Sequence, residues 1–288
     1  SFQLPGHISI DFHYLLSTIM HRSNTPPSTF FEAGKTIFRG KRKDTKHRKS
    51  LHTELSLFHA FFGTWPCICA ELWRRIDPCT MIHPKSLVMH LLWTLLLMTN
   101  YSIEAVNAAL VGVDEDTFRR WTMPWLPKIA LLSIDLIDWE RRFDGAWHYW
   151  TFCVDGIHCP IWEPRRPFWD GWYSHKFEGA GLAYEVATAV TTGWIVWING
   201  PFPAGRWPDD VIFKHSLAKK VRVGIEKGVC DAGYKACHKW LFRPYWRTKA
   251  GLAEQLPRND LHEYIRARHE QLNSRFHRFN CIASIFCH

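Results

Sequence analysis

Long hydrophobic runs are absent from this sequence of 288 residues. The longest apolar stretch, Leu87–Met98, is interrupted by His90 and is too short to span a bilayer, so it is predicted to form a buried helix. No secretory signal is visible, and the chain begins with Ser1 instead of Met, as expected of a fragment or a processed chain. The sequence therefore predicts no membrane partner.

A disulfide framework is absent as well. The 9 cysteines are an odd number, and their spacing suggests no set of bridges. Cys67 and Cys69 are separated by one residue, whereas a zinc knuckle has a gap of two, so we assign no structural zinc. Free thiols are typical of a reducing compartment.

Acidic residues are fewer than basic ones, 27 against 36, which gives a formal net charge of +9 and an isoelectric point near 9.1. This excess favours an anionic partner, with nucleic acid ahead of a membrane surface. Hydrophobic residues make up 47% of the chain, enough for one large or two modest domains. Most of the 16 tryptophans are expected in the core, with a minority available to stack on bases.

Two aspartates follow apolar segments that are typical of β-strands. Asp155 comes at the end of the apolar run 147–154, so we expect it at the carboxyl end of a strand, where Gly156 lets the chain turn beside a bound ion. Asp231 repeats this design after Val229 and Cys230. Both carboxylates are therefore candidate metal ligands.

A third acidic motif lies on a predicted helix. His262, Arg266 and Glu270 are spaced four residues apart and share one face of that helix. Glu263 lies near the same face, but Asp260 and Glu263 resemble a capping box, so Glu270 is the predicted ligand. Two strand-borne aspartates and one helix-borne glutamate can converge on hard divalent cations, which prefer carboxylate oxygens.

The three motifs in this order resemble the DDE superfamily endonucleases, specifically the Harbinger-type transposases and their domesticated relatives. The motifs are Asp-Gly-x-His, then Asp-x-Gly-Tyr, then Asn-x-x-His-x-x-x-Arg-x-x-x-Glu, and the resemblance covers residues 152–279. Tyr-Ser-His-Lys at 173–176 is similar to the family's Tyr-x-Arg-Lys segment, and 203–209 is similar to its Pro-Gly-x-x-x-Asp turn. The chain departs from the family pattern at His175, Ser274 and His277, where Arg, Gly and Lys are usual.

The resemblance implies an RNase H-like α/β catalytic domain preceded by an all-helical amino-terminal region. We expect 1–50 to be a basic and largely irregular arm, 51–145 the helical region and 146–288 the catalytic domain. Apolar patterns predict the elements after the Asp155 strand: a hairpin of 182–191 and 194–198, a helix over 209–221 capped by Asp209 and Asp210, a strand over 223–230 and a last helix over 259–279. The last helix is predicted to bury an apolar stripe, opposite Glu270, of Leu261, Tyr264, Ile265, Leu272, Phe276 and Phe279.

A helix-turn-helix is predicted within the helical region. Ser102 and Asp114 are expected to cap its two helices, and Gly112 to break the chain between them. The second helix has an acidic first turn that would repel phosphates, which Arg119 and Arg120 offset in part. A packing helix and a DNA-recognition helix both remain open.

The amino-terminal arm ends in a basic run over 39–49. Its two compatible functional interpretations are a nuclear import signal and a phosphate-binding arm, and the alternative is a solvated flexible segment. We expect a nuclear protein whose partner is DNA. The candidate DNA contacts are Lys41, Arg42, Lys43, Lys46, Arg48, Lys49, Arg119, Arg120, Lys176 and Arg268.

The carboxylates predict a metal-dependent DNA endonuclease of transposase type that hydrolyses phosphodiester bonds, with possible strand transfer. Asp155 would bridge two Mg²⁺ or Mn²⁺ ions, and Asp231 and Glu270 would each hold one. Such a pair of ions activates a water on one side of a phosphodiester and stabilises the leaving oxygen on the other.

Three residues are expected to support these ligands without touching the metal: His158, His262 and Arg266. For His158 a hydrogen-bonded turn histidine is the alternative. The rival function is a domesticated, catalytically inactive DNA- or chromatin-binding relative, and a metal-dependent RNase is more distant. The resemblance also implies a separate DNA-binding partner protein in some cases, and we expect oligomerisation.

Overall fold

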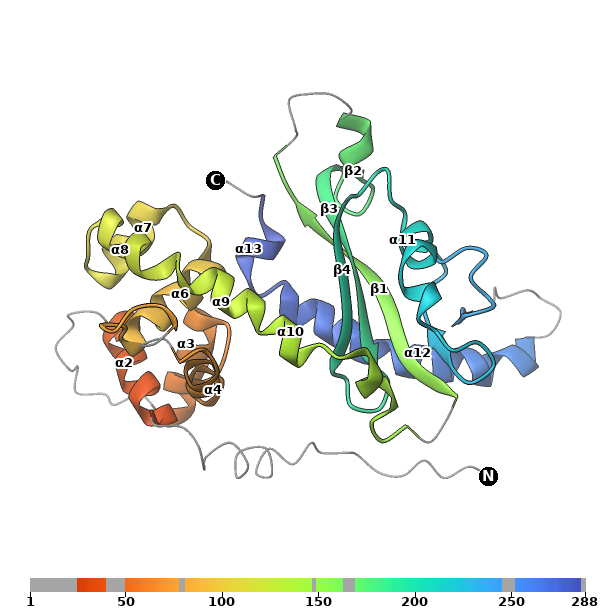
Figure 1. Ribbon diagram of the computed structural model, residues 1–288, viewed down its shortest axis with the longest axis horizontal. Coiled ribbons are helices and arrows are strands. Elements are labelled where there is room, and N and C mark those ends of the chain that lie inside the picture. The colour runs from red at the N-terminus through yellow and green to blue at the C-terminus, as the bar shows by residue number, and fades with distance from the viewer. Residues whose placement is uncertain are drawn as a thin grey trace. The chain divides into compact units, whose positions relative to one another are not determined.

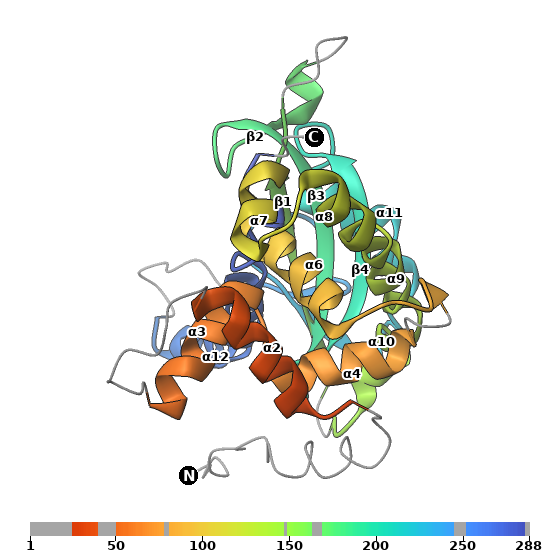
Figure 2. The same cartoon turned by 90° about the vertical axis from the view of Figure 1, so that its left-hand side faces the viewer.

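The computed structural model describes residues 25–39, 50–77, 81–146, 149–162, 169–244 and 252–285. The chain divides into two compact units, Ser1–Leu132 and Ser133–His288 (Figures 1 and 2). Part of the predicted DNA contacts lies outside the described residues: Lys41, Arg42, Lys43, Lys46, Arg48, Lys49 and the side chain of Arg268.

The first unit is built from helices, as predicted for the amino-terminal region, but the second unit begins at Ser133, within the range 51–145 that was predicted to be the helical region. They are α2 (Pro27–Arg39), α3 (Leu51–Phe62), α4 (Pro66–Ile76), α6 (Val88–Asn100), α7 (Glu104–Val111), α8 (Glu115–Thr122) and α9 (Trp125–Leu131). Helix α2 lies within the segment that we expected to be largely irregular. It forms because Phe30 and Ile37 are buried and Gly34 allows a close approach to α3, where an added Cβ would come 2.6 Å from the Phe58 ring.

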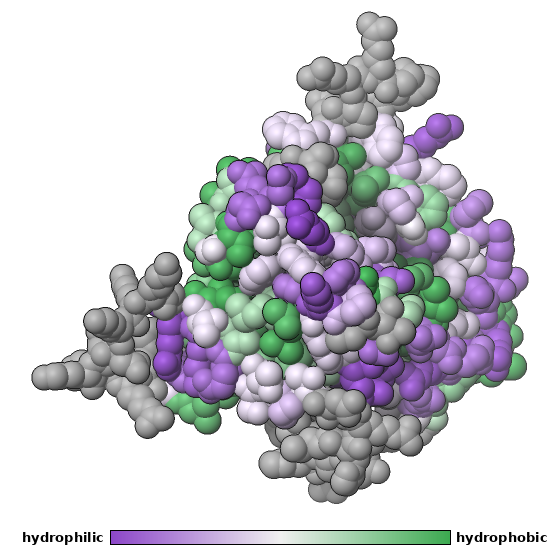
Figure 3. Space-filling model, turned by 60° about the vertical axis from the view of Figure 1, so that its left-hand side comes forward, coloured by the Kyte–Doolittle hydropathy of each residue, from purple (hydrophilic) through white to green (hydrophobic). Residues whose placement is uncertain are grey.

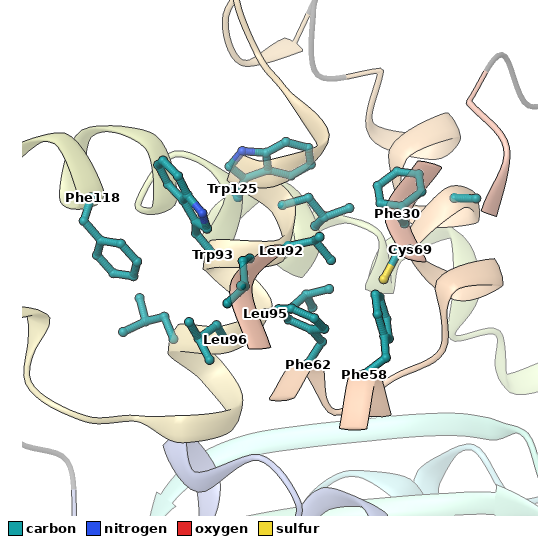
Figure 4. Close-up of a cluster of buried hydrophobic side chains, with 14 of the residues drawn as sticks. Phe30, Phe58, Phe62, Cys69, Leu92, Trp93, Leu95, Leu96, Phe118 and Trp125 are labelled. Carbon is teal, nitrogen blue, oxygen red and sulfur yellow. The ribbon is translucent and has the colours of Figure 1, made fainter. Parts of the chain in front are cut away.

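Helix α6 is the centre of the first unit, and it is the buried helix predicted from the longest apolar run. Figure 4 shows Leu92, Leu95 and Leu96 of α6 lying between Phe58 of α3 and Phe118 of α8. Among the described residues no single helix is long and apolar enough to cross a membrane, although the bent pair α3 and α4 together meets the length and composition required.

Helices α7 and α8 form the predicted pair. Asp114 caps α8, because its Oδ1 accepts the Thr117 amide at 2.8 Å, and Gly112 ends α7 with a φ of 78°. The predicted Ser102 cap is wrong: Ile103 stands at that position, and the Ser102 carbonyl instead accepts the Asn107 side chain at 2.9 Å. The hydrogen bond from the Asn107 side chain to the Ser102 carbonyl therefore holds the segment that precedes α7.

The second unit combines a mixed sheet with helices, so a mixed α/β unit after a helical amino-terminal region is confirmed. The strands are β1 (Trp150–Pro160), β2 (Tyr173–Ser174), β3 (Gly179–Ala189), β4 (Ile195–Pro203), β5 (Lys227–Val229) and β6 (Leu241–Phe242). The helices are α10 (Ser133–Leu136), α11 (Asp209–His215), α12 (Leu252–Phe276) and α13 (Asn280–Ala283), with 3-10 segments at Trp139–Phe143, Trp169–Trp172 and Leu217–Lys219.

Strand β1 is central in the sheet order β2-β3-β1-β5-β6, with β4 also on β3. It pairs antiparallel with β3 from Phe152 to Pro160, but parallel with β5 only as far as Cys153. The predicted hairpin is confirmed as β3 and β4, whose turn contains Gly193 at φ 71°. Beyond Cys153, β1 therefore has a strand on one edge only among the described residues.

The two faces of the sheet carry different helices, α11 on one and α12 on the other (Figure 1). Phe152 and Val154 pack with Phe213 of α11, whereas Cys153 packs with Val229 and Ile265 of α12. Because successive residues of a strand point to opposite faces, Asp155 lies on the same face as Cys153, toward α12.

Several predicted boundaries are wrong. Asp155 lies in the middle of β1 and not at its end, because β3 continues to pair with β1 as far as Pro160. Helix α11 ends at His215, and β5 is shorter than the predicted strand. Helix α12 begins at Leu252, so Asp260 is inside the helix and cannot form the predicted capping box.

Candidate metal centre and the adjoining cleft

Asp155 presents its carboxylate from the middle of β1 toward α12. Its Oδ1 accepts the Gly156 amide at 2.8 Å, and its Oδ2 accepts Nδ2 of Asn273 on α12 at 3.3 Å. Asn273 was not among the residues predicted for the site, although it lies one helical turn after Glu270 and therefore near the same face. These two bonds fix the direction of the Asp155 carboxylate.

Asp231 lies directly beyond the end of β5, the parallel neighbour of β1. Its Oδ1 accepts the Gly233 amide at 2.8 Å, which closes the Asp-x-Gly turn. Burial raises the pKa of Asp231, and the negative charge of Asp155 raises it further. The structure therefore brings the two predicted aspartates into one electrostatic neighbourhood.

Glu270 projects from α12 with its side chain 63% exposed, and it pairs with Arg266 at 3.5 Å. The buried thiol of Cys153 is influenced by the charge of Glu270 and by the charges of both aspartates. Burial raises the pKa of the Cys153 thiol, and the nearby charges of Asp155, Glu270 and Asp231 raise it again. All three predicted carboxylates therefore act electrostatically on the same buried thiol, and the charge of Arg266 opposes their effect.

Two buried histidines attach α12 to the sheet. His262 Nε2 donates to the carbonyl of Cys230 at 2.6 Å, immediately before Asp231. His269 Nε2 donates at 3.1 Å to the carbonyl of Val186, the residue that pairs with Asp155. Burial lowers the pKa of both imidazoles, so they are neutral at pH 7. These two hydrogen bonds fix α12 to the sheet next to Asp231 and next to Asp155.

The buried face of α12 corrects the predicted apolar stripe. Tyr264, predicted to be buried, is 62% exposed, and among the described side chains of α12 the buried ones are His262, Ile265 and His269. The side chain of Leu261, also predicted to be buried, lies outside the described residues. His269 was missed because a histidine carries no apolar signal, although its distance of seven residues from His262 is a helical repeat. Glu263 is exposed on this helix.

The donor set suits a hard cation. Within the described parts of the chain, no three His, Cys, Asp or Glu side chains stand close enough to hold a metal ion as they are arranged. The candidate oxygen donors are the carboxylates of Asp155 and Asp231, which influence each other electrostatically, and the side-chain amide of Asn273, which bonds to Asp155. The buried Oδ1 of Asn273 has no hydrogen-bond partner within the described structure. Carboxylate and amide oxygens are the ligands that Mg²⁺ and Mn²⁺ prefer, so the residues fit such an ion.

Asp209 was predicted to cap a helix, and this is wrong. Pro208 is at the cap position of α11, and the Asp209 carboxylate lies 3.7 Å from His158 Nε2 and 3.6 Å from Lys176 Nζ. Burial opposes ionisation of Asp209, but His158 and Lys176 together lower its pKa below the ordinary value. A largely buried carboxylate on the α11 face therefore stays ionised.

His158 and Lys176 complete this second cluster. His158 lies on β1 and not in a turn, and its Nδ1 bonds to the buried Ser174 hydroxyl at 2.7 Å. Lys176 Nζ donates to the Gly156 carbonyl at 2.5 Å. Gly156 is needed here because a Cβ would come 2.0 Å from Asp209 Oδ1, so its role is close packing and not the predicted turn.

A cleft of about 670 Å³ connects these residues. It follows the part of β1 beyond its pairing with β5, and Asp155, His158, Lys176 and Asn273 all line it. The other lining residues are Gly156, Ile157, Pro160, Ile161, Phe177, Glu178, Gly179, Ala180, His277, Ala283 and Ile285.

The predicted DNA contacts of the first unit are partly engaged within the protein. Arg119 of α8 pairs with Glu104 of α7 and, at 3.2 Å, with Asp116. Arg120 is exposed. On the face shown in Figure 3, hydrophilic side chains gather in separate patches with hydrophobic ones between them. The Arg119 ion pairs favour the packing interpretation of this helix pair.

Comparisons of the chain with models of protein families, with curated proteins and with solved structures give no match.

Proposed function

We propose that the second unit is an RNase H-like catalytic domain and that the chain is a metal-dependent DNA endonuclease of the transposase type. The observation that carries this proposal is the pair formed by Asp155 on β1 and Asp231 just beyond the end of β5, the parallel neighbour of β1. Burial raises the pKa of Asp231, and the negative charge of Asp155 raises it further. A divalent cation between them would relieve the repulsion between the two carboxylates.

The sheet topology supports the same proposal. An antiparallel series of β1, β3 and β4 is extended on the other side of β1 by the parallel strands β5 and β6, which is the arrangement expected of an RNase H-like sheet. The candidate ligands lie on β1, after β5 and on the helix that covers this face. The formal charge of +9 favours DNA as the partner.

Asp155, Asp231 and Asn273 would hold the cations. Glu270, whose side chain is 63% exposed, would add a carboxylate from the solvent side. When bound, two such ions supply a metal-activated water and charge stabilisation for the leaving oxygen of a phosphodiester. The chain's own contribution is orientation. Asn273 and the Gly156 amide fix the carboxylate of Asp155, and His262 fixes the backbone that carries Asp231.

Arg266 has a separate task in this proposal. It pairs with Glu270 at 3.5 Å, and its charge lowers the pKa of nearby groups, including Asp231, that burial and negative neighbours raise. This guanidinium partly neutralises the carboxylates before a metal binds. It also lies beside them as a donor for a phosphate oxygen of DNA.

The test is nicking of supercoiled plasmid by the full chain with Mg²⁺ or Mn²⁺, with EDTA as the metal-free control. Asp155→Asn removes a charge and little shape, so we expect it to abolish nicking. Asp135→Asn, at an exposed position of α10, is the matched control and should keep full activity. Equal nicking by both variants would refute the proposal.

A catalytically inactive DNA-binding relative is the second candidate. It is favoured by the 63% exposure of Glu270 and by the absence of a preformed three-residue cage among the described residues. This candidate predicts DNA binding without nicking under every metal condition, and equal DNA affinity for the wild type and the Asp155→Asn variant with or without Mg²⁺. Replacing plasmid DNA by RNA tests the remaining nuclease alternative.

A further inference from the structure

Phe177 presents an aromatic ring to the cleft. It belongs to the turn between β2 and β3 and is 37% exposed. Two glycines of β3 accommodate the ring: a Cβ at Gly181 would come 2.5 Å from Phe177 Cζ, and one at Gly179 would come 3.6 Å from Cδ2. The backbone of β3 therefore supports the ring along one side and leaves the rest of it accessible to the cleft.

The size and lining of the cleft suit one or two nucleotides. Its volume of about 670 Å³ is in the range of small-molecule sites, and Ile157, Pro160 and Ile161 line it together with Phe177. Asp155 lines the same cleft, so a molecule bound against Phe177 extends toward the candidate metal ligands.

Lys176 provides positive charge next to this aromatic ring. Its side chain is 45% exposed. The ammonium has three donors; one is taken by the Gly156 carbonyl, and Asp209 lies 3.6 Å from the nitrogen on the α11 side. His277 also lines the cleft, and the negative charges are Asp155 and Glu178. A backbone phosphate therefore has a cation available between the ring and the candidate metal centre.

We propose that this cleft binds an unpaired nucleotide next to the phosphodiester that is cut, with the base stacked on Phe177. The position of the cut rests on the proposed function, whereas the stacking itself does not. Every base has a π-face, so stacking on an aromatic ring tolerates all sequences. Phe177 would then set the position of the nucleic-acid strand in the cleft. The phosphate of the stacked nucleotide would lie at Lys176, and the next phosphodiester would lie at Asp155.

The experiment uses the full chain and a single-stranded oligonucleotide that carries 2-aminopurine, in EDTA so that no strand is cut. We expect 2-aminopurine fluorescence to be quenched on binding by the wild type and by Phe177→Trp. Phe177→Leu keeps an apolar contact with the β3 glycines but has no π-face, so it should lose the quenching and weaken binding roughly five- to 100-fold. Trp194→Ala is the matched control, because it removes an exposed aromatic ring in the turn between β3 and β4, outside the cleft lining.

The outcomes separate this inference from the proposed function. Quenching that depends on the aromatic ring, in a chain that never nicks DNA, would leave the nucleotide site standing and remove the nuclease. Equal quenching and affinity for the wild type and Phe177→Leu would overturn the inference, and so would equal loss in Phe177→Leu and Phe177→Trp, which indicates packing alone. Quenching of a fully paired duplex to the same extent would contradict the requirement for an unpaired base.

Discussion

Glu185 of β3 gives the second unit a pH-dependent stability. The residue is 1% exposed, and its Oε1 accepts hydrogen bonds from Trp197 Nε1 at 2.8 Å and from the Ser216 hydroxyl at 3.3 Å. Burial, together with the charge of Asp209, raises its pKa from 4.5 to about 7 against these hydrogen bonds. At about 1.4 kcal/mol for each pH unit, ionising Glu185 inside the fold costs about 3 kcal/mol.

The sign follows from proton binding. Between pH 4.5 and about 7 the folded chain keeps the Glu185 proton, whereas the unfolded chain has released it, so the free energy of unfolding falls as pH rises through this window. Glu185→Gln removes the titration. We expect the variant to match the wild type near pH 4.5 and to be more stable by up to about 3 kcal/mol above pH 7.

Hydrogen exchange of β3 amides in increasing urea is the appropriate assay, because it reports on the second unit alone in a chain of two units. The quantity to plot is the difference in unfolding free energy between Glu185→Gln and the wild type at each pH. Glu263→Gln, at an exposed position, should give a flat difference. A flat difference for Glu185→Gln as well, or a difference that falls as pH rises, would show that Glu185 does not keep its proton in the fold.

Two further predictions concern the candidate site. Glu270→Gln should reduce metal-dependent nicking at least tenfold, whereas Glu263→Gln, which is exposed and caps nothing, should change stability by less than about 0.5 kcal/mol and leave nicking intact; the reverse pattern would exchange their roles. Gly156→Ala should destabilise the second unit by about 1–3 kcal/mol, because its Cβ would collide with Asp209. Adding Asp209→Ala should recover part of that loss in thermal unfolding, and a strictly additive double variant would contradict the collision.

The sequence predicts the candidate aspartates because their signal is local. An apolar run followed by Asp is visible in the sequence at both Asp155 and Asp231, and the parallel pairing of β1 and β5 places the two runs on neighbouring strands. The contacts around these aspartates depend on residues that are distant in the sequence. That β1 continues past Asp155 depends on pairing with the distant β3, and that Gly156 packs against Asp209 depends on α11.

The start and the buried face of helix α12 were not predicted correctly from the sequence. Pro257 and the charged residues around it weaken the helical signal, so the predicted start at residue 259 falls well after the actual start at Leu252. The buried face contains His262 and His269, which accept burial because each donates to a backbone carbonyl of the sheet. A hydropathy pattern does not indicate that a polar residue will be buried with a hydrogen-bond partner. Asn273 was missed for the same reason.

The most direct measurement of the central claim is calorimetric titration of Mn²⁺ into the full chain at neutral pH, with Asp155→Asn and Asp231→Asn as the comparison. We expect the wild type to bind Mn²⁺ and each variant to bind at least tenfold more weakly while keeping wild-type folding by circular dichroism. Because burial and Asp155 raise the pKa of Asp231, wild-type affinity should also fall as pH is lowered through that pKa. Equal Mn²⁺ affinity in the wild type and both variants, or no binding by the folded wild type, would contradict the assignment of this site to a metal.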